Sequence, residues 1–327
     1  MTATSWSRIR HWFASHWHTI RQVLTAAFIL LVVVLLGMAA VRVEWGEVVS
    51  AIQGLPARAL WIAAGLAALS YAVYSTFDVL GKWYTGHGLA WWRCMMVGFI
   101  SYAFTMSLGA PVGGLGLRLR LYSKQNLQPA DIMRILGLSL TTNWVGYLFL
   151  AGIVFAMGVV RLPVEWKLDS GPLRVIGVVM VLTGIAYLLL CAFSKTRSWT
   201  IRGHEIELPS FGLAAIQVSI AIVNWALIAA VIYVLFQQKV DYLVVLATLL
   251  ISAIAGALAH IPGGLGVIEA VFVALLAGSM ARGEIIGALL VYRAIYYLGP
   301  LLIAGGWYLG VEAKMDNPRD NVKAQPR

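Results

Sequence analysis

The chain has 327 residues, of which 61% are hydrophobic and only 12% are charged. A soluble domain of this length needs far more charge on its surface, so the composition excludes that class and indicates an integral membrane protein. The net charge of +10 would suit a nucleic-acid partner, but the Lys and Arg residues lie in short segments between apolar runs. Such residues face anionic headgroups and set the orientation of the chain, so we expect no nucleic-acid partner.

The N-terminal residues 1–20 are basic and aromatic and precede the first apolar run. No small-residue cleavage pattern follows that run, so the segment does not read as a cleaved signal peptide. We predict an amphipathic segment at the cytoplasmic interface, with Trp6, Trp12 and Trp17 at the level of the headgroups.

Six apolar runs are long enough to cross a bilayer, because a helical span needs about 20 apolar residues. We predict full spans at residues 22–41, 59–80, 132–160, 173–193, 210–236 and 285–311. Two further apolar stretches, 94–110 and 243–260, each end at the tetrapeptide Gly-Gly-Leu-Gly. Charge balance decides whether these two stretches cross as well.

The distribution of Lys and Arg favours two stretches that turn back. If both return to the side from which they entered, 16 of the 24 Lys and Arg residues are cytoplasmic, 7 lie outside and Arg293 lies within a span. If both stretches and residues 267–280 cross, the counts become 10 and 13, or 13 and 10 in the reverse orientation. Cytoplasmic segments carry the excess of positive charge. We therefore predict two re-entrant hairpins and two cytoplasmic termini.

The two tetrapeptides lie 150 residues apart, and this offset extends to their surroundings. It aligns the predicted span 59–80 with 210–236, and the span 132–160 with 285–311. Each half then has three crossings and one re-entrant hairpin, so the two halves have opposite orientations. We predict an all-α integral membrane fold in which six full transmembrane helices and two re-entrant helical hairpins form an inverted repeat.

The predicted fold is a single polytopic membrane domain. It covers residues 21–312, with halves at about 21–160 and 172–312, and is followed by a cytoplasmic tail at 313–327. Inverted repeats hold their substrate near the middle of the membrane. Glycine there permits a tight reversal and the close approach of a ligand, and proline ends the descending limb. The predicted turns contain Pro111, Gly113, Gly114, Gly116, Pro262, Gly263, Gly264 and Gly266.

Charged residues beside the turns form the candidate substrate site. Arg118 and Arg120 follow the first turn, and an arginine deep in the membrane costs at least about 3 kcal/mol. Two interpretations stay open. The guanidinium forks bind a lipid phosphate, or the side chains snorkel to the cytoplasmic headgroups.

Glu269 follows the second turn, and Arg293 lies in the middle of a span. Glu269 either forms a structural salt bridge, with Arg293 as a candidate partner, or alternates between an arginine and a proton or substrate. Arg293 is too central to snorkel easily, so we expect a cavity or a buried pair. Asn143 completes the site, because the offset places it opposite Arg293; an interhelical hydrogen bond is its alternative role. Asp78, near a span end beside Lys82, is expected at the membrane interface.

The remaining polar residues do not indicate catalysis. Cys94 and Cys191 are expected to be free, buried thiols, and no histidine has the spacing of a metal ligand. A Walker A sequence is absent from the chain, so we expect no ATP drive within it. The sequence therefore predicts no cofactor and no catalytic residue.

Two segments resemble a known family. The sequences "IPGGLGVIEAVFVALLAG" and "GGLGLRLRLYSKQ" are similar to the transmembrane region of bacterial lysylphosphatidylglycerol synthetases, the flippase domain of the MprF type. The second pattern runs from Pro262 to Glu269, whereas Val112 separates the proline from the glycines in the first copy. The resemblance implies movement of anionic or aminoacylated phospholipid between leaflets, with Glu269 and the arginines near the turns as functional residues. The synthetases also carry an aminoacyl-transferase domain, for which the tail after residue 312 is too short, so we expect no synthetase activity.

Sequence and resemblance together favour a phospholipid translocase in the bacterial inner membrane. An arginine-lined groove carries the headgroup, and the expected partner is an ordinary anionic phospholipid such as phosphatidylglycerol or cardiolipin. Three alternatives stay open: a polyprenyl-phosphate carrier, a membrane-embedded lipid-modifying enzyme, and a non-transporting partner of a lipid synthase. A homo-oligomer also stays open.

Overall fold

The computed structural model describes residues 45–159, 170–201, 204–259 and 264–315. The predicted interfacial segment and first span, the turn residues Pro262 and Gly263, and the end of the tail lie outside these ranges. Residues 1–46 form a unit of their own, and the architecture below concerns the unit that begins at Glu47.

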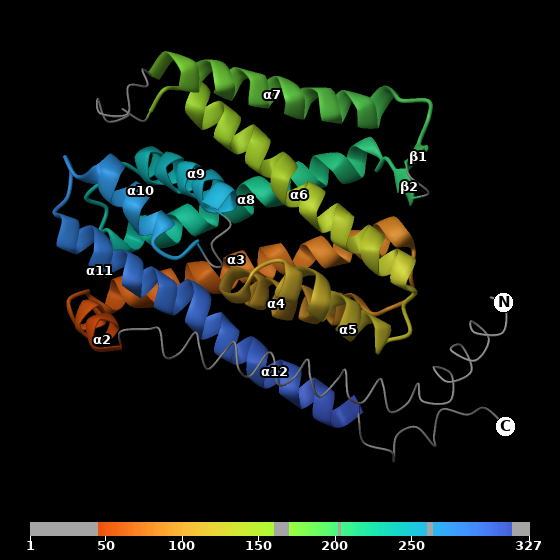
Figure 1. Cartoon of the computed structure of the whole chain (residues 1–327), viewed down its shortest axis with the longest axis horizontal. Coiled ribbons are helices and arrows are strands. Elements are labelled where there is room, and N and C mark those ends of the chain that lie inside the picture. The colour runs from red at the N-terminus through yellow and green to blue at the C-terminus, as the bar shows by residue number, and fades with distance from the viewer. Residues whose placement is uncertain (1–44, 160–169, 202–203, 260–263, 316–327) are drawn as a thin grey trace, which may run out of the picture. The chain divides into compact units, whose positions relative to one another are not determined.

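The described chain is nearly all helical (Figure 1). Its elements in chain order are α2 (Trp45–Gln53), α3 (Ala57–Thr85), α4 (Trp91–Leu108), the π-helix η1 (Pro111–Leu117), α5 (Arg118–Ser123), α6 (Pro129–Ala156), α7 (Ser170–Phe193), β1 (Ser198–Ile201), β2 (His204–Glu207), α8 (Phe211–Leu235), α9 (Tyr242–Ala259), α10 (Val267–Leu276), α11 (Arg282–Arg293), the π-helix η4 (Ala294–Leu298) and α12 (Gly299–Met315).

Six stretches of the described chain are long and apolar enough to cross a membrane. They are Ala57–Thr85, Pro129–Ala156, Gly171–Phe193, Phe211–Leu235, Tyr242–Ala259 and Arg282–Glu312. Five of them coincide with predicted spans. The remaining stretch, Tyr242–Ala259, is α9, and it occupies residues that we predicted to be one limb of a re-entrant hairpin. Its 18 residues measure about 27 Å as a helix, so re-entrance of this limb stays a prediction.

Helix α3 is the centre of the bundle. It packs along α8, α4 and α6, and α7 packs mainly on α6. Helix α7 turns large apolar side chains outward, among them Val175, Leu182 and Phe193, which are 64%, 59% and 78% exposed. Apolar exposure on this scale suits contact with lipid and not with water.

Helices α6 and α7 approach each other through two glycines. A Cβ on Gly152 would lie 2.9 Å from the Gly177 carbonyl oxygen, and one on Gly177 would lie 2.7 Å from the Gly152 carbonyl oxygen. Real Cβ atoms do not come so close to a neighbouring backbone. The two backbones therefore touch directly, as is typical of small residues at membrane helix interfaces.

The first Gly-Gly-Leu-Gly belongs to a helical hairpin. A Cβ on Gly113 would lie 2.6 Å from Thr105 Cα, eight residues earlier, whereas residues eight apart in one helix are separated by about 12 Å. The chain therefore folds back between α4 and η1, at Gly109, whose φ of 92° is left-handed.

The position of this reversal corrects the predicted turn. Pro111, Gly113, Gly114 and Gly116 do not form the reversal but lie after it, within η1. Proline suits the first residue of a helix, because its missing N–H has no helical partner there and its φ is already helical. Pro111 therefore begins the returning limb and does not end the descending one.

The described part of the second Gly-Gly-Leu-Gly, residues 264–266, has a different backbone. Helices α9 and α10 pack against each other, and between them Gly264 and Gly266 have φ of 58° and 78°. This left-handed conformation is strained for other residues. The first copy is helical and the described residues of the second form a turn, so the inverted repeat stays a prediction.

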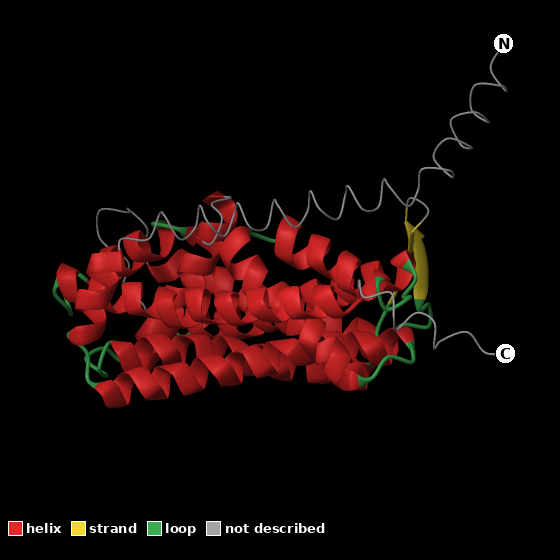
Figure 2. Cartoon of the chain, turned by 90° about the horizontal axis from the view of Figure 1, so that it is seen from below, coloured by secondary structure: helices red, strands yellow, loops and turns green. Residues whose placement is uncertain are grey.

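A two-stranded antiparallel hairpin, β1–β2, departs from the all-α expectation (Figure 2). Its last residue connects it to the helices: the Tyr84 hydroxyl donates to the Glu207 carbonyl at 2.7 Å, and Arg134 forms an ion pair with the Glu207 carboxylate. The hairpin is thereby fixed beside the end of α3 and the start of α6.

We predict that Gly177→Leu destabilises the protein by about 1–3 kcal/mol, because the larger side chain forces α6 and α7 apart. A matched control is Gly306→Leu in α12, where a Cβ has no atom within 4 Å. Thermal unfolding in detergent measures both variants. Equal melting temperatures for the two leucine variants would contradict the close helix contact.

Candidate functional site

Charged side chains inside the bundle are paired across elements. Three carboxylates, those of Asp78, Glu269 and Glu312, form ion pairs with arginine or lysine, and each pair joins a helical hairpin to a long helix. These pairs contain all four charged residues of the predicted site.

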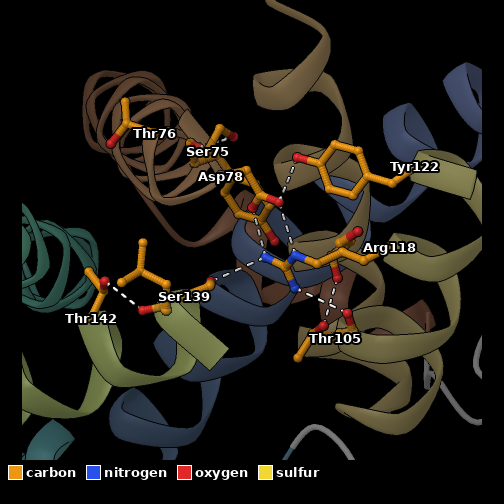
Figure 3. Close-up of polar contacts among 12 residues, drawn as sticks. Ser75, Thr76, Asp78, Thr105, Arg118, Tyr122, Ser139 and Thr142 are labelled. Atoms are coloured by element: carbon orange, nitrogen blue, oxygen red, sulfur yellow. Dashed lines mark hydrogen bonds and ion pairs between the residues drawn. The ribbon is translucent and has the colours of Figure 1, made fainter. Parts of the chain in front are cut away.

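Arg118 and Asp78 form the most deeply buried pair (Figure 3). The Arg118 fork donates from Nε to Asp78 Oδ1 at 3.1 Å and from Nη2 to Oδ2 at 2.9 Å. Tyr122 Oη donates to Asp78 Oδ1 at 3.0 Å, and Arg118 also reaches Ser139 Oγ and the Gly114 carbonyl, each at 3.3 Å. The side chains of Arg118 and Asp78 are 2% and 0% exposed, so the whole ionic group is satisfied by protein.

This arrangement corrects two expectations. Snorkelling of Arg118 is wrong, because its side chain is buried and directed at Asp78. Asp78 was expected at the interface beside Lys82, whereas it is fully buried and bound to Arg118. The signal in the sequence was a carboxylate close to an apolar span together with an arginine in another apolar segment, since each needs an ion of opposite charge.

Arg120 belongs to a second charge cluster. Arg120 and Lys124, at the end of the first hairpin, both donate to Oε1 of Glu312 in α12. Their side chains are 14% and 22% exposed, and that of Glu312 is 6% exposed. The cluster links the returning limb of the hairpin to the last long helix.

Glu269 and Arg293 form the third pair, beside the glycine turn. Arg293 donates through Nε and Nη2 to the two Glu269 oxygens, the second contact at 3.0 Å. Its Nη2 also donates to the Gly264 carbonyl at 3.0 Å, and its guanidinium lies 5.4 Å from the centre of the Tyr297 ring. The structural salt bridge considered for Glu269 is thus present. At 19% and 13%, these side chains are more exposed than those of the Arg118 pair.

A buried hydroxyl network follows Arg293 in the chain. Ser70 Oγ donates to Asn224 Oδ1 at 2.8 Å and lies 2.7 Å from Tyr296 Oη. Tyr102 Oη lies 3.1 Å from the same Tyr296 oxygen, and Tyr71 Oη donates to the Tyr296 carbonyl at 3.0 Å. The Tyr296 side chain is thus bound from α3 and α4, its carbonyl is bound from α3, and α8 joins the network through Ser70.

Asn143 does not join this network. In the part of the chain that the structure describes, no hydrogen bond of its side chain leads to Arg293 or Glu269, and Asn224 supplies the interhelical contact instead. The offset of 150 residues alone suggested Asn143, and alignment in sequence does not specify which way a side chain points. Sequence analysis did not assign Asp78, Glu312 or Tyr296 to the polar contacts inside the bundle.

Other ligand chemistry has little support in the described residues. No group of three His, Cys, Asp or Glu side chains suitable for a metal ion occurs among them. Cys94 and Cys191 are both buried and unbridged. The charge pairs are therefore the polar features on which a function can be built.

Comparison with known proteins identifies relatives along nearly the whole chain. The sequence model of the lysylphosphatidylglycerol synthase transmembrane region matches residues 22–304. Inner membrane protein YbhN of Escherichia coli (strain K12) is 46% identical over 309 residues, which cover 94% of this chain and 97% of that protein. The uncharacterized protein slr0712 of Synechocystis sp. is 29% identical, with 79% of this chain and 80% of that protein aligned.

A more distant relative is the phosphatidylglycerol lysyltransferase of Bacillus subtilis (strain 168). It is 24% identical, and the alignment covers 84% of this chain but only 32% of that protein. The chain therefore corresponds to about a third of the lysyltransferase.

We predict that Asp78→Asn destabilises the protein by about 3–5 kcal/mol, because it leaves the Arg118 charge buried without a counter-ion. The double variant Asp78→Leu with Arg118→Met should recover most of this loss, since an apolar pair has no charge to desolvate. Thermal unfolding in detergent is the measurement.

The control for this prediction is Glu284→Gln, which breaks a pair with Lys239 whose side chains are 48% and 47% exposed. Exposed pairs contribute at most about 1 kcal/mol. A similar loss at both sites would contradict the importance of the buried pair.

Proposed function

This chain belongs to the family of the lysylphosphatidylglycerol synthase transmembrane region, and from that premise we propose that it is a phospholipid translocase of the bacterial inner membrane. It moves anionic phospholipid between the leaflets, with phosphatidylglycerol or cardiolipin as the expected cargo. The headgroup passes along a polar path at the two helical hairpins while the acyl chains stay in the bilayer. The lysyl transfer named for the Bacillus subtilis relative is not part of this proposal.

The observation that carries the proposal is the partly exposed Glu269–Arg293 pair. A guanidinium with a bidentate carboxylate partner has the geometry that also binds a phosphate. Ionisable residues within a membrane domain are costly and typically mark a substrate path. We infer that a lipid phosphate replaces Glu269 on Arg293 during passage, and that Glu269 takes Arg293 back when the lipid leaves.

The depth of this pair supports a transport site. Trp61 and Trp83 in α3 are 79% and 63% exposed, as expected of headgroup-level anchors. They lie 22 residues apart, or about 33 Å along a helix, which matches the hydrocarbon thickness of about 30 Å. Ser70 and Tyr71 lie midway between them and bind Tyr296. Arg293, three residues before Tyr296, is then near the midplane, where transporters bind their substrates.

Charge asymmetry supports an orientation. The end of the bundle that contains Trp83 carries eight basic residues of the described chain, and the opposite end carries four. The eight are Lys82, Arg93, Arg120, Lys124, Arg134, Lys195, Arg197 and Lys314, and the four are Arg58, Arg174, Lys239 and Arg282. By the positive-inside rule, the end with Trp83, where α12 also ends, faces the cytoplasm.

The test is lipid scrambling in vesicles that contain the purified protein and a fluorescent phosphatidylglycerol. Loss of a charge-assisted contact costs about 1.5–3 kcal/mol, so Arg293→Ala should slow movement about 10- to 100-fold. Glu269→Gln should also slow it, because Arg293 is then not recovered. A matched control is Lys239→Ala, which removes a surface cation from an exposed ion pair.

Wild-type rates for both Arg293→Ala and Glu269→Gln would contradict the proposed site. Absence of movement by the wild-type protein would contradict the translocase itself. Stronger competition by a polyprenyl phosphate than by phosphatidylglycerol would identify the polyprenyl phosphate as the cargo. A new lipid product in mass spectra would show that the protein is an enzyme and not a translocase.

A further inference from the structure

The last long stretch, Arg282–Glu312, is not one regular helix. Its α11 and α12 follow each other directly (Figure 1). They are joined by the π-helical segment η4, in which the Gly299 N–H donates to the Ala294 carbonyl, five residues earlier. π-Helical turns are rare, occur mostly as single turns within α-helices, and are frequent at functional sites. Arg293 is the last residue before this segment.

Pro300 explains why the helix widens here. In a regular α-helix its ring would clash with the carbonyl of Tyr296, four residues earlier, and would offer that carbonyl no N–H. The carbonyl is satisfied from outside the helix, because Tyr71 Oη in α3 donates to it at 3.0 Å. The Tyr296 side chain is held as well, with its hydroxyl 2.7 Å from Ser70 Oγ and 3.1 Å from Tyr102 Oη.

The π turn has a consequence for the direction of the side chains at the two ends. It accommodates one residue more than an α turn, and each residue of an α-helix rotates the chain by about 100°. Glu312 follows Arg293 by 19 residues, so in a straight α-helix the two would point about 100° apart. With one residue absorbed by the π turn, the remaining 18 correspond to about five full turns. Arg293 and Glu312 then share one face.

Both residues use this shared face to bind a hairpin. Arg293 binds Glu269 in α10, at the second hairpin, and Glu312 binds Arg120 and Lys124, at the first. Closure of η4 into an α turn would rotate one end of the stretch by about 100° relative to the other. The Arg293–Glu269 contact would then be lost, because Glu312 is held by two cations and Glu269 is held only through its more exposed pair with Arg293.

We propose that Pro300 and Tyr71 are positioning residues for Arg293. By keeping one extra residue in the π turn, they align Arg293 with Glu269 while Glu312 stays bound to the first hairpin. The inference rests on the proposed function, because it gives Arg293 the orientation from which it exchanges Glu269 for a phosphate. No hydrogen bond or ion pair of the described chain joins either positioning residue to Glu269.

The test measures whether Arg293 and Glu269 still interact when the π turn is released. Arg293→Gln, Glu269→Gln and their double variant form a double-mutant cycle, read as melting temperatures of the full chain in detergent. The cycle is repeated in a Pro300→Ala/Tyr71→Phe background, which restores the helical N–H and removes the external donor. We expect non-additive shifts in the wild-type background and additive shifts in the altered one.

A deletion distinguishes register from general damage. Removing Ile295 in the Pro300→Ala/Tyr71→Phe background takes out the extra residue, so a regular α-helix again places Arg293 and Glu312 on one face. Non-additivity between Arg293 and Glu269 should return. If the altered background does not fold, the deletion should restore folding for the same reason. Pro129→Ala is the matched control. Pro129 begins α6, so its replacement does not change which side chains share a face of that helix.

Persistent non-additivity in the Pro300→Ala/Tyr71→Phe background would overturn the proposal, and so would failure of the deletion to restore folding or coupling. None of these readouts requires lipid movement. If the coupling behaves as expected and vesicles show no transport, the proposed function fails while the positioning role stands. If vesicles show transport and the coupling between Arg293 and Glu269 does not depend on the π turn, the positioning role fails while the proposed function stands.

Discussion

A charge inside a hydrocarbon-lined domain needs a counter-ion, and this need determines how the two helical hairpins are held. Desolvation of an unpaired arginine costs more than any single packing contact returns, so each arginine buried inside the described bundle has a carboxylate on another element. In the first hairpin Arg118 binds Asp78 of α3, and in the second Glu269 binds Arg293 of α11. The charges are reversed between the two hairpins, but each pair fastens a helical hairpin to a longer helical stretch, Ala57–Thr85 for the first and Arg282–Glu312 for the second.

The Arg118–Asp78 and Glu269–Arg293 pairs differ in how deeply they are buried. Arg118 and Asp78 are 2% and 0% exposed, and Tyr122 and Ser139 complete their hydrogen bonds. Such a group stabilises a fixed arrangement, because separating it leaves two desolvated ions. Glu269 and Arg293 are 19% and 13% exposed and lie beside left-handed glycines. The exchange that we propose therefore belongs to the Glu269–Arg293 pair, and the structural role belongs to the Arg118–Asp78 pair.

Sequence analysis predicted the long helices because a bilayer requires about 20 apolar residues in each, and it anticipated the Glu269–Arg293 pair because both charges stood out against apolar surroundings. It misplaced the first reversal, since Pro111 is equally compatible with ending one helix and with beginning the next. It missed the pairing of Asp78 with Arg118, 40 residues later, because partner choice between elements depends on side-chain direction. The β1–β2 hairpin is too short to leave a clear periodic signal.

Central to this account is that the charge-fastened hairpins return to the side of the membrane from which they came. Cysteines placed singly at Gly88, before α4, and at Asn126, after α5, test this most directly with a membrane-impermeant thiol reagent, because the native Cys94 and Cys191 are buried. The account predicts that both positions are labelled only from the cytoplasmic face, with Lys239→Cys labelled only from the opposite face. Labelling of Gly88→Cys and Asn126→Cys from opposite faces would contradict it.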